Sequence, residues 1–323
     1  EILMKTHAGR WLVALCVLMF CAAAAVLASG WQTGLSNQVN SQILWQLQLP
    51  LTITAVITGA ALSVSGASLQ VVLRNPLADP GIIGISSGAS LVAAFVLILA
   101  PQALVDHLPY TLPVACFTGA LFSTWLIYRL SVRLRGINTA VILAGIAITT
   151  LTSAIMGWLY LFADAQSMRN LTFWIMGSLH QADAWVLLVS APIIVLSLLI
   201  IGRNATALNV LYTGDLTAKR AGVDPDKLKL TIMIACALAV GAAVAIAGSI
   251  AFLGLLVPHY LRLVIGHNNR YLLPASAVTG ATILLLVALI SEWVPFAALP
   301  VSMVTATIGG PLLLFAMVKG QLK

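Results

Sequence analysis

Residues 59–91 read GAALSVSGASLQVVLRNPLADPGIIGISSGASL. The stretch begins with small residues typical of a closely packed membrane helix and is interrupted by RNPLADPG. Pro76 and Pro80 lack a backbone donor and disfavour helix in the residue before them, so a continuous helix is excluded. Arg74 and Asp79 must lie at a membrane face or in water, because the rest of the chain is so apolar. We therefore predict two membrane helices joined by a turn, and we interpret the turn as a gate in a transport pathway.

The composition defines the broad class of protein. Of 323 residues, 61% are hydrophobic and 8% are charged, whereas a soluble domain has roughly 25% charged residues. The apolar runs are long enough for helices and do not alternate as barrel strands do, so we expect a single all-α transmembrane domain over residues 1–323. The net charge of +7 suggests no nucleic acid partner, since basic residues in membrane proteins mark cytoplasmic loops.

Hydrophobic runs and turn residues predict about ten membrane spans. The expected spans are 11–29, 47–72, 86–100, 112–130, 140–162, 184–201, 230–248, 252–265, 272–290 and 304–318. Residues 31–46 should form a polar external segment, and Asn170–Leu179 is apolar but too short to span, which predicts an interfacial or re-entrant helix.

The distribution of basic residues predicts the orientation. With the N-terminus inside, these spans place every one of the 16 Lys and Arg residues on the cytoplasmic side except Arg169. Such an asymmetry is what the positive-inside rule expects. Both termini should therefore be cytoplasmic.

A long polar segment at about 205–229 should lie on the cytoplasmic side. Within it, the sequence DLTAKRAG predicts a short helix with Asp215 as its N-cap, Lys219 and Arg220 near its end and Gly222 as its C-cap. The chain has no G-x-x-x-x-G-K-[ST] loop, so we expect no bound nucleotide. Because the spans are nearly free of ionisable residues, an ion-coupled secondary transporter is disfavoured, and this segment is a docking place for a separate motor.

Two further patterns have competing interpretations. Gly84–Gly88 matches the nucleophile pattern G-x-S-x-G, and an intramembrane serine protease could pair Ser86 or Ser87 with His259. The strand that this pattern requires is absent, so glycine and serine more plausibly loosen a helix start beside a polar pathway. His259 is either a structural hydrogen-bonding residue or part of the pathway, and His180 is either a solvated loop residue or a contact for a ligand or partner.

No spacing of His, Cys, Asp or Glu predicts a metal site. The four cysteines, Cys16, Cys21, Cys116 and Cys236, lie in apolar runs and indicate small buried or lipid-facing residues rather than disulfides.

Six ordered motifs resemble the iron-chelate and cobalamin permeases of bacterial ATP-binding cassette importers. They are RNPLADPGIIGISSGASL (74–91), ILAGIAI (142–148), FWIMGSL (173–179), LNVLYTGDLTAKRAGV (208–223), AGSIAFLGLLVPHYLRLVIGHNNRYLLPASAVTGA (247–281) and LPVSMVTATIGGPLLLF (299–315). The resemblance implies a ten-helix permease in the bacterial inner membrane that forms a homodimer. It also implies two cytoplasmic ATPase subunits, which hold ATP and Mg, and one periplasmic binding protein. This chain would then have no catalytic residue and no bound cofactor.

The resemblance also assigns roles to residues. It implies a cytoplasmic gate at Asn75, Leu77, Asn138 and Thr139, and a pathway lined near its outer end by Asn170–Leu179. The ATPase-coupling residues would be Asp215, Leu216, Thr217, Ala218, Lys219, Arg220, Ala221 and Gly222. The lining residues we single out are Ser63, Ser86, Ser87, Trp174 and Met176.

One departure concerns the docking of the binding protein. Many relatives read R-L-P-R at the start of the second span, and those arginines contact acidic residues of the binding protein. This chain has Gln48 and Leu51 instead, and Glu292 lies near a third basic position. Docking would then be weaker and less dependent on salt, or would use other contacts.

The resemblance implies an iron-containing chelate as the transported ligand. Haem is the first choice and a ferric siderophore the second, because GASLQVVLRNPLADPGIIGISSGAS resembles haem-type members more than cobalamin-type ones. Cobalamin remains an alternative within the same family. Few charges in the spans suit a large, partly apolar ligand that passes by alternating access.

Overall fold

The computed structural model describes residues 2–31, 34–81, 83–99, 107–133, 140–181, 184–293 and 299–318. Helices account for most of these residues. They are α1 (Ile2–Ser29), α2 (Asn37–Ile43), the π-helix η1 (Leu44–Gln48), α3 (Leu49–Val72), α4 (Ile85–Leu99), α6 (Leu108–Arg133), α7 (Ala140–Tyr160), α8 (Ala165–Ile175), the 3₁₀-helix η2 (Leu179–Gln181), α9 (Ala184–Arg203), α10 (Ala205–Tyr212), α11 (Asp215–Arg220), α12 (Pro225–Ala247), α13 (Leu253–Ile265), α14 (Asn269–Trp293) and α15 (Val301–Val318).

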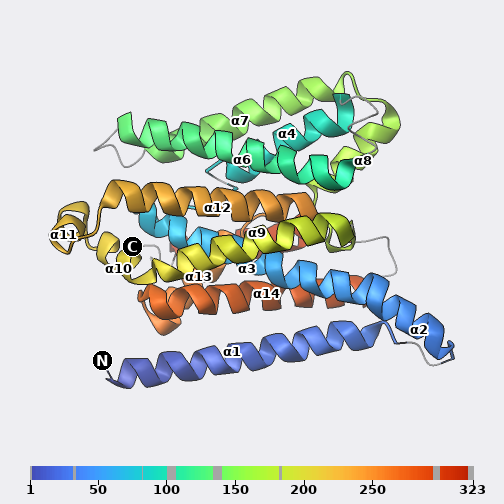
Figure 1. Ribbon diagram of the computed structural model, residues 1–323, viewed down its shortest axis with the longest axis horizontal. Helices are drawn as coiled ribbons and strands as arrows, with labels where there is room; N and C mark the ends of the chain where they lie inside the picture. The colour runs from blue at the N-terminus through green and yellow to red at the C-terminus, as the bar shows by residue number, and fades with distance from the viewer. Residues whose placement is uncertain are drawn as a thin grey trace.

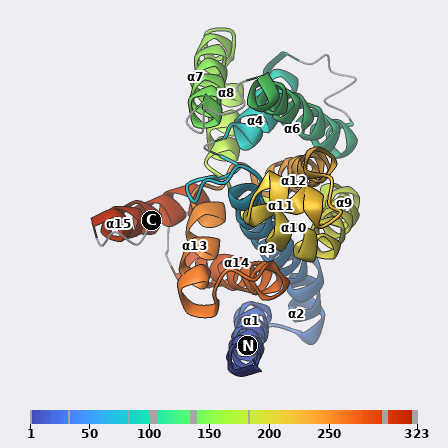
Figure 2. The ribbon, with the colours of Figure 1, turned by 90° about the vertical axis from the view of Figure 1, so that its left-hand side faces the viewer.

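The long helices lie side by side, and their ends form two opposite faces of the bundle (Figure 1). Seen end-on, α3 lies in the middle, with α12, α13 and α14 around it (Figure 2). The helices α4, α6 and α7 form a group on one side, α1 covers α14, and α15 projects away from the rest (Figure 2). The interrupted stretch of the sequence is therefore the central helix and its continuation.

Small residues let α3 pack closely on its neighbours. Every residue from Thr58 to Val72 is buried. A Cβ atom at Gly59 would collide with the backbone of Gly280 in α14, and one at Gly66 would collide with the backbone of Gly254 in α13. In lipid there is little hydrophobic gain from helix association, so close backbone contact supplies much of the packing energy. The small-residue spacing of the sequence is thus a helix-contact surface.

The all-helical membrane prediction is confirmed in its coarse form. Among the described residues, seven helices are long and apolar enough to cross a membrane, and three shorter apolar helices occur at Ile85–Leu99, Leu253–Ile265 and Val301–Phe315. These elements match the ten expected positions, whereas the exact span count and the cytoplasmic location of the termini remain predictions.

The short helix α13 is preceded by an irregular segment that is packed inside the protein. A helix of 13 residues is about 20 Å long, which is less than the roughly 30 Å of hydrocarbon. The segment after α12 is bonded through Ser178 N–H to Ala247 O at 3.0 Å, and Ser302 donates its hydroxyl to Ser249 O. Non-helical backbone at this depth is tolerated because protein groups satisfy it.

Two predicted boundaries are wrong. The second span was expected to start near residue 47, after the polar external segment, but the chain is already helical from Asn37 and continues through η1 into α3. Ser36 caps its start, since its hydroxyl accepts a hydrogen bond from Val39 N–H. The helix expected at Asn170–Leu179 is α8, which begins five residues earlier because Asp164 caps it by accepting from Ser167 N–H at 2.9 Å.

The ends of several helices can be assigned to one or the other of the two faces. The N-terminal end of α1 lies on the face that carries α10 and α11, and α2 lies at the opposite end (Figure 1). The helix α8, which contains Arg169, lies away from the α11 face (Figure 1). The sidedness of the two faces remains a prediction from the distribution of basic residues.

Gly59→Ala should destabilise the protein, because the new methyl group meets the backbone of Gly280 rather than a movable side chain. Overpacking of this kind costs about 1–3 kcal/mol. Gly157→Ala is the matched control, since α7 leaves open space around Gly157, and an exposed helical glycine replaced by alanine should gain roughly 0.5–1 kcal/mol. The melting temperature in detergent distinguishes them, and an unchanged value for Gly59→Ala would contradict close α3–α14 packing.

Candidate functional site

The helix α3 ends in a defined turn at the RNP sequence. Asn75 N–H donates to Gln70 O at 3.1 Å and Arg74 N–H donates to Val71 O at 3.2 Å, which is the Schellman arrangement of a helix end. Arg74 takes the left-handed position with φ of 49°, where glycine is usual. A side chain in that conformation costs roughly 1–2 kcal/mol. The backbone therefore forms a sharp exit from α3, and the arginine side chain is retained there at a cost.

The turn itself is stabilised by two side chains. Asn75 Oδ1 accepts from Leu77 N–H at 2.9 Å, and Asp79 Oδ1 accepts from Gly81 N–H at 2.8 Å. Such Asx turns fix the backbone locally. Asn75 and Leu77 are half-buried, which leaves part of each accessible at this face. The other predicted gate residues, Asn138 and Thr139, lie outside the described residues.

Asp215 joins the turn to the helix α11 and to the start of α12. Its carboxylate accepts from Arg74 Nη2 at 2.6 Å and from Lys229 Nζ at 2.9 Å. The prediction that Asp215 is the N-cap of α11 is wrong: Gly214, with φ of 132°, holds that position, and Asp215 is the first helical residue. One carboxylate thereby links the exit of α3, which is 141 residues away in the sequence, to α11 and to the start of α12, which is 14 residues away.

The predicted coupling helix presents most of its side chains to solvent. Ala218 is buried against the protein, while Leu216 is 74% exposed, and Thr217, Lys219, Arg220, Ala221 and Gly222 are exposed as well. The helix ends where Gly222 takes φ of 81° and Val223 N–H donates to Ala218 O at 2.9 Å. A short helix with an exposed leucine beside two basic residues is suited to contact another protein.

The structure also shows a second link to α3 that the sequence did not reveal. Arg262 of α13 donates from Nη2 to Ala67 O at 3.1 Å and to Gln70 Oε1 at 3.2 Å, and Gln70 Nε2 donates to Leu255 O at 3.3 Å. An arginine inside a short apolar span is the signal that could have predicted it, because such a residue needs partners within the protein. Together these bonds fix the end of α3 against α13.

The predicted lining residues do not share one cavity. Ser63 and Ser86 are buried and Ser87 is half-buried; Ser63 lies in the contact of α3 with Gly280. Trp174 is buried and Met176 is half-buried near the irregular segment after α12, and Met176 O accepts from Ser302 N–H at 3.2 Å. Their role as lining residues therefore remains a prediction.

The serine protease interpretation finds no support. Ser86 is at the start of α4, which packs on α6 and α7, whereas His259 is in α13, which packs on α3 and α14. The hydroxyl of Ser86 and Nε2 of His259 are each buried without a hydrogen-bond partner. A nucleophile and its base must be within hydrogen-bond reach of each other.

The predicted docking residues meet at the end of the bundle opposite α11. Gln48 Nε2 donates to Glu292 Oε1 at 2.9 Å, and both line a cavity of about 470 Å³ together with Leu51 and His180. Burial lowers the pKa of His180, and the nearby Glu292 partly offsets this. Among the described residues that line this cavity, Glu292 is the only acidic side chain, and there is no Lys or Arg.

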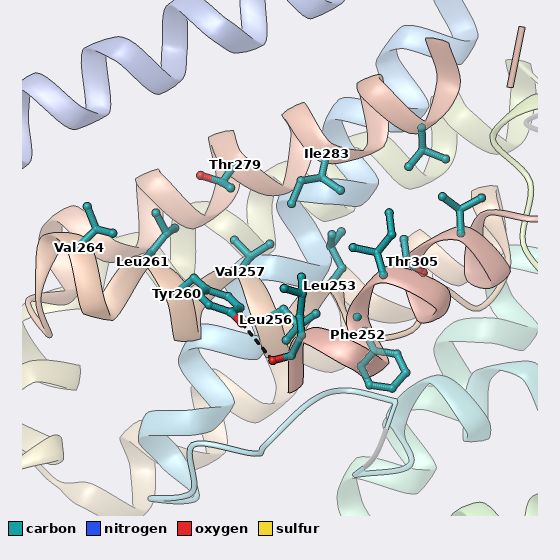
Figure 3. Close-up of a pocket in the computed structure, with 15 residues that line it drawn as sticks. Phe252, Leu253, Leu256, Val257, Tyr260, Leu261, Val264, Thr279, Ile283 and Thr305 are labelled. Carbon is teal, nitrogen blue, oxygen red and sulfur yellow. Dashed lines mark hydrogen bonds between the residues drawn. The ribbon is translucent and has the colours of Figure 1, made fainter. Parts of the chain in front are cut away.

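A separate apolar cavity of about 240 Å³ lies between α13, α14 and α15 (Figure 3). Leucine, valine and isoleucine side chains form most of its wall, and Tyr260 donates its hydroxyl to Leu312 O at 3.1 Å. It contains none of the predicted site residues. No group of three or more His, Cys, Asp or Glu side chains that could hold a metal ion occurs within the part of the chain that the structure describes.

Comparison with known proteins gives consistent matches over nearly the whole chain. The profile of the FecCD transport family matches residues 10–319. The hemin transport system permease protein HmuU of Yersinia pestis is 39% identical over 90% of this chain and 86% of that protein. The vitamin B12 import system permease protein BtuC of Vibrio cholerae is 35% identical over 94% and 92%. A solved structure of a metal-chelate type ABC transporter in an inward-facing conformation is 29% identical, with a TM-score of 0.85 over 96% of this chain and 99% of that one.

Asp215→Ala should loosen α11, because it removes both ion pairs at once. The Arg74 and Asp215 side chains are each 44% exposed, and pairs of this kind contribute about 0.2–1 kcal/mol each. Amides of α11 should then exchange with deuterium roughly five-fold faster, as measured by mass spectrometry. The control is Lys227→Ala, which removes an exposed 3.8 Å pair with Asp224. Equal exchange in both variants would show that Asp215 does not hold α11.

Proposed function

Because this chain belongs to the FecCD transport family, we propose that it is the translocation subunit of an ATP-driven importer that moves a metal chelate into the cytoplasm. The family is one of permease subunits of ATP-binding cassette importers, and the chain is an inner-membrane protein. Its role is transport rather than catalysis.

The observation that best supports this proposal is the connection between α11 and the turn after α3. A partner ATPase can drive transport through an exposed helix only if the movement of that helix is transmitted to the transport pathway. Asp215 provides that connection, since it bonds to Arg74 at the exit of α3 and to Lys229 in α12. The helix would carry the force, and the two ion pairs would transmit it to two long helices.

The mechanism we propose is alternating access. Closure of two partner ATPases, which hold ATP and Mg, displaces residues 215–222 and thereby tilts α3 and α12. The turn that contains Asn75 and Leu77 moves with α3, and it would open or close against Asn138 and Thr139. Switching elements of this kind are two packed arrangements with a small free-energy difference. The chelate itself needs only weak contacts along the pathway.

The proposed partners follow from the same family. We propose a homodimer with two cytoplasmic ATPases and one periplasmic binding protein, with both termini and α11 in the cytoplasm. The projecting helix α15 supports a homodimer, because it packs on the described part of the chain mainly through α13 (Figure 2). The binding protein would dock at the opposite face, where Gln48, Leu51 and Glu292 lie. Glu292 would favour a basic contact residue on the binding protein. The arginines found at this face in many relatives favour an acidic one.

Haem is the ligand we propose. The hemin permease is 39% identical to this chain and the vitamin B12 permease 35%, which favours haem by a small margin. Cobalamin is the second candidate because that relative is matched over slightly more of the chain, 94% against 90%. A ferric siderophore is the third, since it is also a metal chelate.

Reversing the charges of α11 should uncouple transport from ATP hydrolysis. In the double variant Lys219→Glu and Arg220→Glu, both side chains are exposed, so folding should be unaffected. Ligand-stimulated ATPase activity of the complex in proteoliposomes should fall at least about ten-fold. This figure assumes that the basic side chains contact acidic groups of the ATPase and that reversing them weakens the interaction free energy by roughly 1.4 kcal/mol in total. Arg133→Glu, exposed at the end of α6, is the matched control. Full stimulation in the double variant would refute the coupling role.

Ligand choice can be tested with the same proteoliposomes. They should contain this chain together with its partner ATPase and its periplasmic binding protein. Uptake of haem should depend on ATP and exceed uptake of cyanocobalamin under the same conditions. Faster uptake of cyanocobalamin would assign cobalamin as the ligand. If neither compound is taken up in an ATP-dependent way, a ferric siderophore would be the remaining candidate.

A further inference from the structure

A second polar site lies between α9, α10 and α14. Its cavity has a volume of about 530 Å³ and lies toward the end of the bundle that carries α11, because α10 directly precedes α11 and α14 begins there (Figure 1). No predicted gate, coupling or docking residue lines it. The lining residues are Val64, Leu198, Gly202, Arg203, Ala205, Thr206, Asn269, Arg270, Leu273, Pro274 and Ala277.

Two arginines give the cavity a strong positive charge. Arg203 is the last residue of α9 and Arg270 lies in the first turn of α14, and both are exposed. No Asp or Glu lines the cavity, and neither arginine forms an ion pair within the described ranges. A guanidinium forms paired hydrogen bonds with phosphate particularly well. The cavity is therefore suited to a phosphate group.

A buried asparagine supplies the second observation. Asn269 is fully buried, and its backbone N–H and Nδ2 donate to Asn209 Oδ1 at 2.8 and 2.9 Å. Its own Oδ1 has no hydrogen-bond partner. A buried oxygen left in this state costs about 1–3 kcal/mol. Because Asn269 belongs to the wall of the cavity, a hydroxyl group of a bound molecule is a candidate for the missing donor.

The floor of the cavity is apolar and extends into the membrane-spanning part of the bundle. Leu273 and Ala277 lie four and eight residues beyond Asn269 in α14, which is about 6 and 12 Å deeper along the helix. Val64 of α3 and Leu198 of α9 complete this part. A positive mouth above an apolar floor matches the two parts of an anionic phospholipid rather than a water-soluble anion.

We propose that this cavity, which we call the α9–α14 site, binds an anionic phospholipid of the cytoplasmic leaflet whose headgroup carries hydroxyls, as phosphatidylglycerol does. Arg203 and Arg270 contact the phosphate, Asn269 accepts from a headgroup hydroxyl, and the lipid chain lies along Leu273 and Ala277. Basic pockets between membrane helices on the cytoplasmic side are known to bind such lipids. The site would fix α10, and with it the neighbouring α11, relative to the membrane surface.

Native mass spectrometry of the purified full chain tests this proposal. The protein is titrated with an equimolar mixture of phosphatidylglycerol and phosphatidylcholine, and the bound lipids are counted by mass. The wild type should retain one phosphatidylglycerol per chain in preference to phosphatidylcholine. In the double variant Arg203→Gln and Arg270→Gln, affinity should fall about 30-fold, since a basic residue at the surface contributes roughly 1 kcal/mol toward an anionic lipid.

Two variants separate the site from general surface charge. Arg129→Gln with Arg133→Gln removes the same charge from exposed positions near the end of α6 and should leave the bound lipid in place. Thr206→Trp, at an exposed position of the wall, should block the site while both arginines remain. Circular dichroism and melting temperature show whether each variant is folded.

Each other outcome would overturn the proposal. Retention of the lipid by the Arg203 and Arg270 variant would exclude this site, and equal loss in the α6 control would show only non-specific charge. Displacement of the lipid by millimolar inorganic phosphate or glycerol phosphate would indicate a small-anion site. If the lipid stays bound and only association with the ATPase is lost, the arginines contact that partner instead. None of these results depends on which ligand the importer carries.

Discussion

The close approach of α3 to α14 and α13 is the constraint on which the rest of the structure depends. Gly59 meets the backbone of Gly280, and Gly66 meets that of Gly254. Because no side chain separates these backbones, α3 is enclosed along its length, and a movement at one end must be taken up by the whole helix. The C-terminal end of α3 therefore moves only together with the rest of the helix. A displacement of the turn at Arg74 must come from the elements that are bonded to it.

The attachment at that turn explains why charged residues occur in so apolar a chain. Arg74 occupies a left-handed position that glycine would fill at lower cost, and its side chain bonds to Asp215. Lys229 shares the same carboxylate. Solvent weakens each of these two ion pairs, so they add little to the overall stability of the protein. Their main effect is to hold the exit of α3, the helix α11 and the start of α12 together. We therefore regard this cluster as the link between the exposed helix α11, which we propose as the coupling helix, and the proposed gate.

Local signals in the sequence were sufficient for the helices and insufficient for their contacts. Apolar runs, prolines and the charge asymmetry predicted the helical elements and the break at Pro76 and Pro80. The start of α8 was misplaced because the capping role of Asp164 was overlooked, although an Asp before a helix is a recognised signal. The N-cap role of Asp215 was wrong because Gly214 holds that position. The ion pair of Asp215 with Arg74 was missed because the two residues are 141 positions apart, and no local pattern reveals such a pair. The contact of Gln48 with Glu292 was missed for the same reason. The Gln70–Arg262 link was missed although an arginine inside a short apolar span is a local signal for such a bond.

The central claim is that α11 and the turn after α3 move as one unit. Pulsed electron paramagnetic resonance can measure two distances in the assembled transporter, with and without ATP. One joins spin labels on Leu216 and Phe122, and the other joins labels on Leu77 and Phe122, an exposed residue of α6. The account predicts that the two distances change together in the wild type, and that in Asp215→Ala only the Leu216 distance still changes. A Leu77 distance that still follows ATP in Asp215→Ala would contradict it.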